Sequence, residues 1–180
     1  MTAADLNVID LLERAKAWIS KGWMKGSMWD SGTGGREIQS PGDLYDPEKR
    51  GKIERVCAVG AMRLAFAEIV EMERGEYETW GSWEQRITRH PLYVEGMTIL
   101  GRGFWNADVR PAYSDGETLL DGLGGRPYTS IDVENTIIDV NDLYDDEDHQ
   151  TVKEDIEAAF ESALRQAKGE EVVRVPEASR

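Results

Sequence analysis

A mainly α fold with a minor β element is predicted by the spacing of apolar residues along this 180-residue chain. Apolar residues recur every three or four positions in residues 3–20 and 152–168, which is typical of amphipathic helices. Residues 53–72 are apolar around most of the helical circumference, as in a helix at the centre of a domain. We therefore expect three principal helices around one core.

The first predicted helix, residues 3–20, has one apolar stripe formed by Val8, Leu11, Leu12, Ala15, Trp18 and Ile19. Thr2 is the expected N-cap, because a hydroxyl at that position accepts a hydrogen bond from a free backbone N–H. Gly22 is expected to end the helix. Residues 22–29 contain too many glycines for a helix and too many aromatic residues for a linker. They predict an ordered turn or a short extended piece that covers the core.

Before the central helix, glycine-rich residues 30–45 predict a loop. Asp46 followed by Pro47 is a helix-start signal, because proline loses no hydrogen bond at the first helical position. Within the central helix, Gly60 costs about 1 kcal/mol relative to alanine. Such a cost suggests a packing reason, and we expect another backbone to approach Gly60 closely.

Residues 73–135 are predicted to be a long irregular insertion between the second and third helices, because glycines and prolines interrupt each apolar run. The minor β element is expected near residues 131–140, which are rich in β-branched side chains. One domain is expected over residues 1–170, with residues 171–180 as a C-terminal tail.

The last predicted helix carries the clearest boundary signals. Thr151 and Glu154 match a capping box, in which each side chain bonds a free backbone N–H near the start of the helix. Gly169 follows the last apolar position and is expected to close the helix.

The chain is strongly acidic, with 35 Asp and Glu residues against 21 Lys and Arg residues and a net charge of −14. A field of this sign repels phosphate backbones, so general nucleic-acid binding is not expected. An acidic chain can instead approach a basic partner, imitate nucleic acid, or merely remain soluble. Residues 1–6 do not have the basic start and apolar run of a signal peptide, so none is expected, and no apolar run approaches the ~20 residues that span a membrane. We expect a cytoplasmic protein that does not associate with membranes.

Three separated pieces carry short motifs, Gly22-Trp23-Met24-Lys25-Gly26, Arg55-Val56-Cys57-Ala58-Val59-Gly60-Ala61, and Val140-Asn141-Asp142 with Thr151-Val152-Lys153-Glu154. With these motifs the chain resembles a small family of unknown function found in actinobacteria and their phages. The matching residues are Trp23, Gly26, Cys57, Gly60, Ala61, Asn141, Asp142, Thr151 and Glu154. Val56 and Val140 depart from the pattern, because the family often has an aromatic residue at each of these two positions. The resemblance implies a shared fold and a phage or actinobacterial origin, but no activity.

Cys57 is the only cysteine and the candidate nucleophile, because the start of a helix lowers the pKa of a thiol. His90 or His149 is available as its base, and Asn141 or Asp142 to orient the imidazole. The alternative for Cys57 is a small buried side chain, since it lies in the most apolar part of the chain. Asn and Asp also shape turns by bonding backbone groups. The sequence favours these structural roles, and no catalytic residue is assigned.

A run of acidic residues after the predicted strands permits a calcium-binding interpretation, with Asp139, Asp142 and Asp145 as ligands. The EF-hand pattern fails, because Tyr144 stands where glycine is required and Gln150 replaces the closing glutamate. A solvated loop is favoured, and neither a metal nor a cofactor is expected.

These observations predict a non-enzymatic accessory protein of phage type, which binds a host or phage protein through an acidic surface that carries aromatic side chains. The alternative is a cysteine-dependent enzyme that uses Cys57 with a histidine from a loop.

Overall fold

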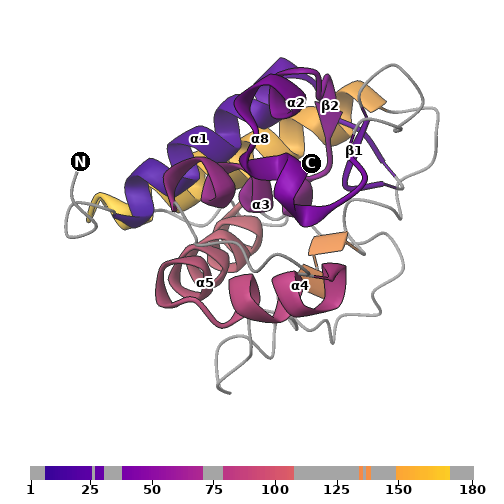
Figure 1. Cartoon of the computed structure of the whole chain (residues 1–180). Helices are drawn as coiled ribbons and strands as arrows, with labels where there is room; N and C mark the ends of the chain where they lie inside the picture. Colours follow the sequence, from indigo (N-terminus) through magenta and orange to yellow (C-terminus); the bar gives the residue numbers. More distant parts are fainter. Residues whose placement is uncertain are drawn as a thin grey trace.

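Helices dominate the protein in a computed structural model, which describes residues 7–25, 27–30, 38–70, 79–107, 134–135, 137–138 and 149–170. Within these ranges the β structure is a two-stranded antiparallel sheet and one isolated bridge (Figure 1). The predicted mainly α fold with a minor β element is confirmed.

Helix α1 spans Val8–Lys21 and buries its apolar stripe in the core. Asn7 caps it, since its side chain accepts a hydrogen bond of 2.9 Å from the backbone N–H of Asp10. The predicted cap, Thr2, lies outside the described residues. Gly22 ends the helix as predicted, and its N–H donates to the carbonyl of Trp18.

Helix α3, Ala58–Ile69, is the central element, and its residues from 58 to 67 are all buried. This burial confirms that a helix apolar around its circumference lies inside the domain. The helix begins at Ala58 rather than at residue 53, because Arg55 and Val56 are held in an extended strand just before it.

That strand, β2 (Arg55–Val56), pairs with β1 (Trp29–Asp30), and Trp29 lies opposite Val56. On its other side β2 contacts Trp23 through an isolated parallel bridge. The extended piece predicted for residues 22–29 is thereby confirmed. It turns back across the start of α3 and places Trp29 beside the strand.

The expectation of a β element near residues 131–140 is wrong for the residues that the structure describes there. Residues 134–135 and 137–138 are helical. Glu134 and Ile137 are both buried, and positions three apart share a face in a helix but take opposite faces in a strand. The burial of Glu134 and Ile137 on one helical face therefore outweighs the preference of the segment's β-branched residues for a strand.

A 3-10 helix, η2 (Pro41–Tyr45), lies within the predicted loop, and α2 (Pro47–Gly51) follows it. Asp46 caps α2 as its sequence predicts. Burial raises the pKa of Asp43, but hydrogen bonds from Lys49 and from two backbone N–H groups outweigh burial, so this pKa is lowered.

Residues 80–106, within the segment expected to be irregular, form α4 (Trp80–Thr88) and α5 (Pro91–Asn106). Pro91 starts α5, where proline is tolerated, rather than breaking a helix. Gly103 lets α5 approach the last helix, because a Cβ there would lie 2.3 Å from the carbonyl oxygen of Ala159. Gly96 serves close packing in the same way, because a Cβ there would lie 2.7 Å from the side chain of Leu11 in α1.

The last helix, α8, spans His149–Ala167. It begins before Thr151, so the predicted capping box does not mark its first residue. Its end agrees with the prediction, because Gly169 has a φ of 74°, a left-handed conformation that glycine adopts readily.

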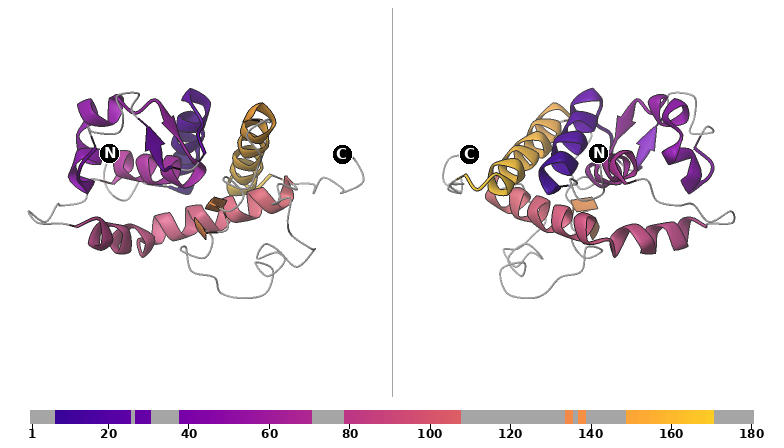
Figure 2. Two further views of the ribbon diagram at one scale, coloured as in Figure 1. Left: turned by 90° about the vertical axis from the view of Figure 1, so that its right-hand side faces the viewer. Right: turned by 60° about the vertical axis from the view of Figure 1, so that its left-hand side comes forward.

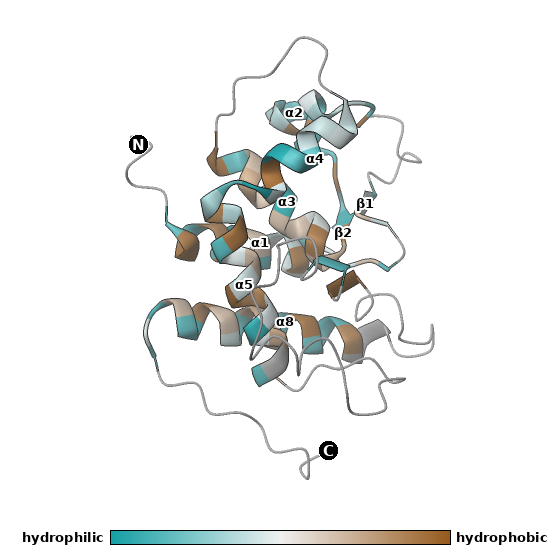
Figure 3. Cartoon of the chain, turned by 90° about the horizontal axis from the view of Figure 1, so that it is seen from below, coloured by the Kyte–Doolittle hydropathy of each residue, from teal (hydrophilic) through white to brown (hydrophobic). Residues whose placement is uncertain are grey.

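The helices pack in crossing layers (Figure 2). Helices α1 and α8 lie side by side and both cross over α5, while α3 packs on the other side of α1. Hydrophilic and hydrophobic residues alternate along α1 and α8, as expected of amphipathic helices whose apolar faces meet (Figure 3). No helix among the described residues is long and apolar enough to cross a membrane.

We expect Gly60→Ala to be strongly destabilising, although alanine favours helices. A Cβ at position 60 would lie 2.0 Å from the carbonyl oxygen of Met28, and that backbone cannot move without disturbing β1. Overpacking of this kind costs about 1–3 kcal/mol. Gly81→Ala is the matched control, since nothing lies within 4 Å of its added Cβ and the helix gains up to about 1 kcal/mol. Urea unfolding of both variants measures the difference, and equal stabilities would contradict the close approach.

Candidate functional site

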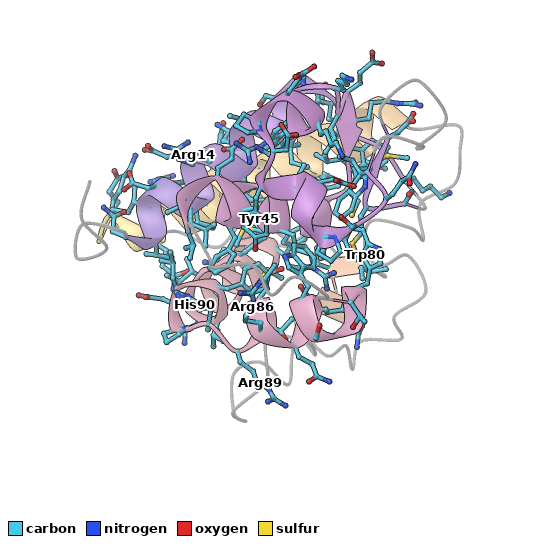
Figure 4. All side chains as sticks on the ribbon, viewed as in Figure 1. Arg14, Tyr45, Trp80, Arg86, Arg89 and His90 are labelled. Carbon is cyan, nitrogen blue, oxygen red and sulfur yellow. The ribbon has the colours of Figure 1, made fainter. Side chains whose placement is uncertain are left out.

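A cleft of about 370 Å³ opens between the turn that carries β1, the middle of α3 and the start of α4. The residues that line it are Ser27, Met28, Trp29, Ile38, Arg63, Trp80, Trp83 and Glu84. Three of these side chains are indoles, and we call the feature the tryptophan cleft. Figure 4 shows Trp80 at the end of α4 that faces β1.

The aromatic wall of the cleft is a chain of three tryptophans. The ring centroids of Trp29 and Trp80 are 6.0 Å apart at a tilt of 37°, and those of Trp80 and Trp83 are 5.6 Å apart in an edge-to-face arrangement. Trp83 is fully buried, and its indole N–H donates to the hydroxyl of Tyr45 at 2.9 Å. Trp83 therefore forms a fixed support behind Trp80.

Trp80 itself faces solvent. It is 38 % exposed, and among the side chains that the structure describes it is the one large apolar side chain that is largely open to solvent. The cap of α4 fixes its position, because the side chains of Thr79 and Ser82 bond each other's backbone N–H groups. Trp80, Trp83 and Glu84 have helical i, i+3 and i+4 spacing, so they share one face of α4.

Arg63 forms the charged floor of the cleft and is only 3 % exposed. Its Nε and Nη2 donate to the two carboxylate oxygens of Glu134, at 3.1 and 2.9 Å. Nη2 also donates to Oε1 of Glu84 at 2.5 Å, and Nη1 lies 3.4 Å from the sulfur of Met28. The guanidinium thus joins α3 to three other segments of the chain, those that carry Met28, Glu84 and Glu134.

Burial and charge act against each other in this network. Burial lowers the pKa of Arg63, but the hydrogen bonds and charge of its carboxylate neighbours Glu134 and Glu84 outweigh burial, so the pKa is raised and the guanidinium stays charged. Burial raises the pKa of Tyr93 well above its usual value, and the charge of Glu134 adds to this. The Tyr93 hydroxyl therefore stays protonated and donates to Glu134 at 2.5 Å.

Two polar side chains of the cleft are already engaged in contacts within the protein. The guanidinium of Arg63 is engaged by carboxylates, and Ser27, the one hydroxyl side chain of the lining, donates weakly to the Trp29 carbonyl at 3.4 Å. A nucleophile requires a base within hydrogen-bond reach. Among the described residues that line the cleft, none supplies such a base to Ser27. Rigid aromatic surface and fixed charge are what the cleft offers.

The sequence-predicted Cys57 lies at the start of α3, where the sequence placed it, but it is only 5 % exposed. Its sulfur accepts a hydrogen bond of 3.2 Å from the N–H of Gly60, and it therefore acts as the N-cap of the helix. Its own N–H donates to the carbonyl of Met28 at 3.0 Å. Both contacts are structural.

His90 lies far from Cys57. Its ring packs edge-on against Phe66 at 4.9 Å, and Phe66 is nine residues further along α3, roughly 13 Å along the helix axis. Figure 4 shows His90 at the opposite end of α4 from Trp80. Burial lowers the pKa of His90, so the imidazole is neutral at pH 7. The structure does not bring these two candidates together.

Several other candidates lie outside the described residues. Asn141 and Asp142 belong to this group, with the proposed calcium ligands Asp139 and Asp145, and so does the side chain of His149. Within the ranges that are described, no three His, Cys, Asp or Glu side chains are grouped as a metal site requires.

The described motif residues of the first two pieces form the framework next to the cleft. Trp23 forms a β-bridge with Val56, and the carbonyl of Met28 packs closely against Gly60. Ala61 is fully buried. Glu154 is exposed on α8. Gly26 and the side chain of Thr151 are outside the described residues.

Sequence reasoning missed the network around Arg63. One signal was present, because Arg63 is the only charged residue between Val56 and Ala67, and a charge in a fully apolar helix must be paired. Its partner Glu134 is 71 positions away along the chain and had no such signal.

Comparison with known proteins identifies the family. A model for a family of unknown function (DUF6197) matches residues 3–166, most of the chain, so the protein belongs to this family. No curated protein and no solved structure matches the chain. The family relationship therefore supports a shared fold and leaves the function to be argued from the site.

We expect Glu134→Ala to lower the free energy of unfolding by about 3–5 kcal/mol, because it leaves the buried charge of Arg63 without its main partner. The double variant Arg63→Met/Glu134→Leu is expected to regain most of this loss, since it removes both buried charges together. Glu161→Gln, in the exposed pair with Lys16, is the control and should cost less than about 1 kcal/mol. Additive losses in the double variant would show that the pair is not coupled.

We expect iodoacetamide to label Cys57 in the unfolded protein and to leave the native protein largely unlabelled, because the thiol is buried in the cap of α3. Mass spectrometry across a series of pH values measures this. Rapid labelling of native protein with a pH midpoint below the usual thiol value of about 8.5 would instead favour a cysteine-dependent enzyme.

Proposed function

We propose that this DUF6197 protein is a non-enzymatic interaction protein, which binds a protein partner through the tryptophan cleft. The observation that carries this proposal is the exposure of Trp80 beside a cleft of about 370 Å³, above a fixed base of buried Trp83 and Arg63. Tryptophan is among the residues most enriched in the energetic centres of protein interfaces.

The rigidity of the cleft supports a binding role. The helix cap of α4, the hydrogen bond from Trp83 to Tyr45 and the ion pairs of Arg63 hold its walls in place. A pre-organised surface loses less conformational entropy when a partner binds, and more of the contact energy then contributes to affinity.

The net charge, and the resemblance to a family found in actinobacteria and their phages, support a proposal for the kind of partner. A net charge of −14 attracts basic partners and repels nucleic acids and acidic surfaces. In this proposal the protein is a phage-type accessory factor, it acts in the cytoplasm of an actinobacterial host, and it binds a host or phage protein.

The proposal is tested by affinity capture from a host lysate with immobilised wild-type protein, Trp80→Ala and a control, Trp18→Phe. Trp18 is a half-buried tryptophan whose indole N–H donates to Glu68 on a different part of the molecule. We expect one stoichiometric partner on the wild type and on Trp18→Phe, and a loss of at least about tenfold on Trp80→Ala.

The capture is repeated at low and moderate salt, since salt screens the attraction between an acidic protein and a basic one. Circular dichroism checks that each variant is folded. A lack of any stoichiometric partner at both salt concentrations, or equal capture by Trp80→Ala, would refute a binding role for this cleft.

A further inference from the structure

We propose that the tryptophan cleft binds the guanidinium group of an arginine side chain, which a basic segment of the partner protein inserts beside Trp80 and Glu84. This inference rests on the proposed function and names the group that the cleft recognises. It is argued from the charge balance of the cleft, the arrangement of its rings and the way in which the protein already holds its own Arg63.

The charges at the floor of the cleft do not balance. Arg63 supplies one positive charge and faces two carboxylates, Glu134 and Glu84. Glu134 is buried against Arg63, whereas the Glu84 side chain is 48 % exposed at the edge of the cleft. Oε1 of Glu84 is bonded to Arg63, and no described residue donates to its Oε2. One cation would complete this site.

The rings define where that cation lies. A planar group held between two indoles needs about 3.5 Å on each side, or roughly 7 Å between the rings. Trp29 and Trp80 are closer than this and tilted, at 6.0 Å and 37°. The ligand therefore does not enter between them and lies on the solvent-facing side of Trp80, one helical turn before Glu84.

Arg63 provides an internal precedent for this arrangement. Its guanidinium carbon lies 6.0 Å from the centroid of the Trp83 ring, while Nη2 donates to Glu84. A second guanidinium on Trp80 would repeat these contacts on the outer side, with an indole face beneath it and Oε2 of Glu84 at its edge. The same carboxylate would then bridge two arginines.

Other ligand classes fit less well. A phosphate or carboxylate would meet the uncompensated negative charge of the cleft. A lysine ammonium is compact and strongly hydrated, so its transfer to an aromatic surface costs more than that of the flat, weakly hydrated guanidinium. A neutral planar group gains stacking and an uncharged hydrogen bond to Glu84, but it lacks the attraction between opposite charges. Arginine combines both contacts.

The experiment uses three acetylated, amidated pentapeptides in which the central residue of a pentaglycine is replaced by arginine, lysine or citrulline. Citrulline is a neutral, planar analogue of arginine, so it isolates the contribution of charge. Each peptide is titrated into the full-length protein, and the indole N–H signals of Trp29 and Trp80 are followed by ¹⁵N NMR. Trp80→Phe and Trp29→Phe variants assign these signals.

We expect the arginine peptide to shift both signals with saturable binding, and the lysine and citrulline peptides to bind at least about fivefold more weakly. Glu84→Gln should weaken binding of the arginine peptide by a similar factor and leave binding of the citrulline peptide nearly unchanged. Glu161→Gln removes the same charge from an exposed pair on α8 and is the matched control, which should bind as the wild type does.

Equal binding of the arginine and citrulline peptides, equal binding of arginine and lysine, or a Glu84→Gln variant that binds normally would each overturn the inference. If affinity capture still yields a partner that depends on Trp80, the proposed function stands while the arginine assignment fails. If capture fails but the arginine peptide binds with the expected selectivity, the cleft is an arginine site whose natural ligand is not a stable protein partner.

Discussion

Arg63 carries a permanent charge into the centre of the fold, and the bidentate contact with Glu134 is the interaction on which the surrounding structure depends. Removing one member of such a pair leaves a buried charge unpaired, which costs far more than the pair contributes when complete. The guanidinium therefore holds Glu134, Glu84 and Met28 in place at once. Tyr93 adds a hydrogen bond from α5 to the same carboxylate.

A second constraint is the contact between backbones at the start of α3. The carbonyl of Met28 accepts a hydrogen bond from Cys57 and lies so close to Gly60 that a side chain there would collide with it. This contact positions the turn whose next residue is Trp29. The first wall of the cleft is thus set by a glycine and a cysteine that lie inside the fold and serve its framework.

Two of the motif residues, Cys57 and Gly60, take part in this framework. A thiol that accepts a hydrogen bond at a helix N-cap is held in one orientation and shielded from solvent. The histidine that the structure describes, His90, packs on the far end of α3. On α4, Trp80 and Glu84 share one helical face at the edge of the cleft, and in our proposal this pair recognises a cation.

Local patterns in the sequence were sufficient to predict the helices found at residues 8–21, 58–69 and 149–167. They also predicted the position of Cys57 near a helix start and the close approach of another backbone to Gly60. Each depends on residues within a few positions of one another, where helical periodicity and capping act. Residues 80–106 were missed because glycines such as Gly96 and Gly103 resemble loop signals until the helices that pack against them are present, α1 and α3 at Gly96 and α8 at Gly103.

Only the tertiary structure decided which distant segments meet. The pairing of Trp29 with Val56, the burial of Glu134 against Arg63 and the exposure of Trp80 all depend on contacts between residues far apart in the chain. A local pattern shows that a charge in an apolar helix needs a partner, but the identity of that partner depends on how the whole chain packs. The cleft exists for the same reason, since its walls come from segments that only the folded core brings side by side.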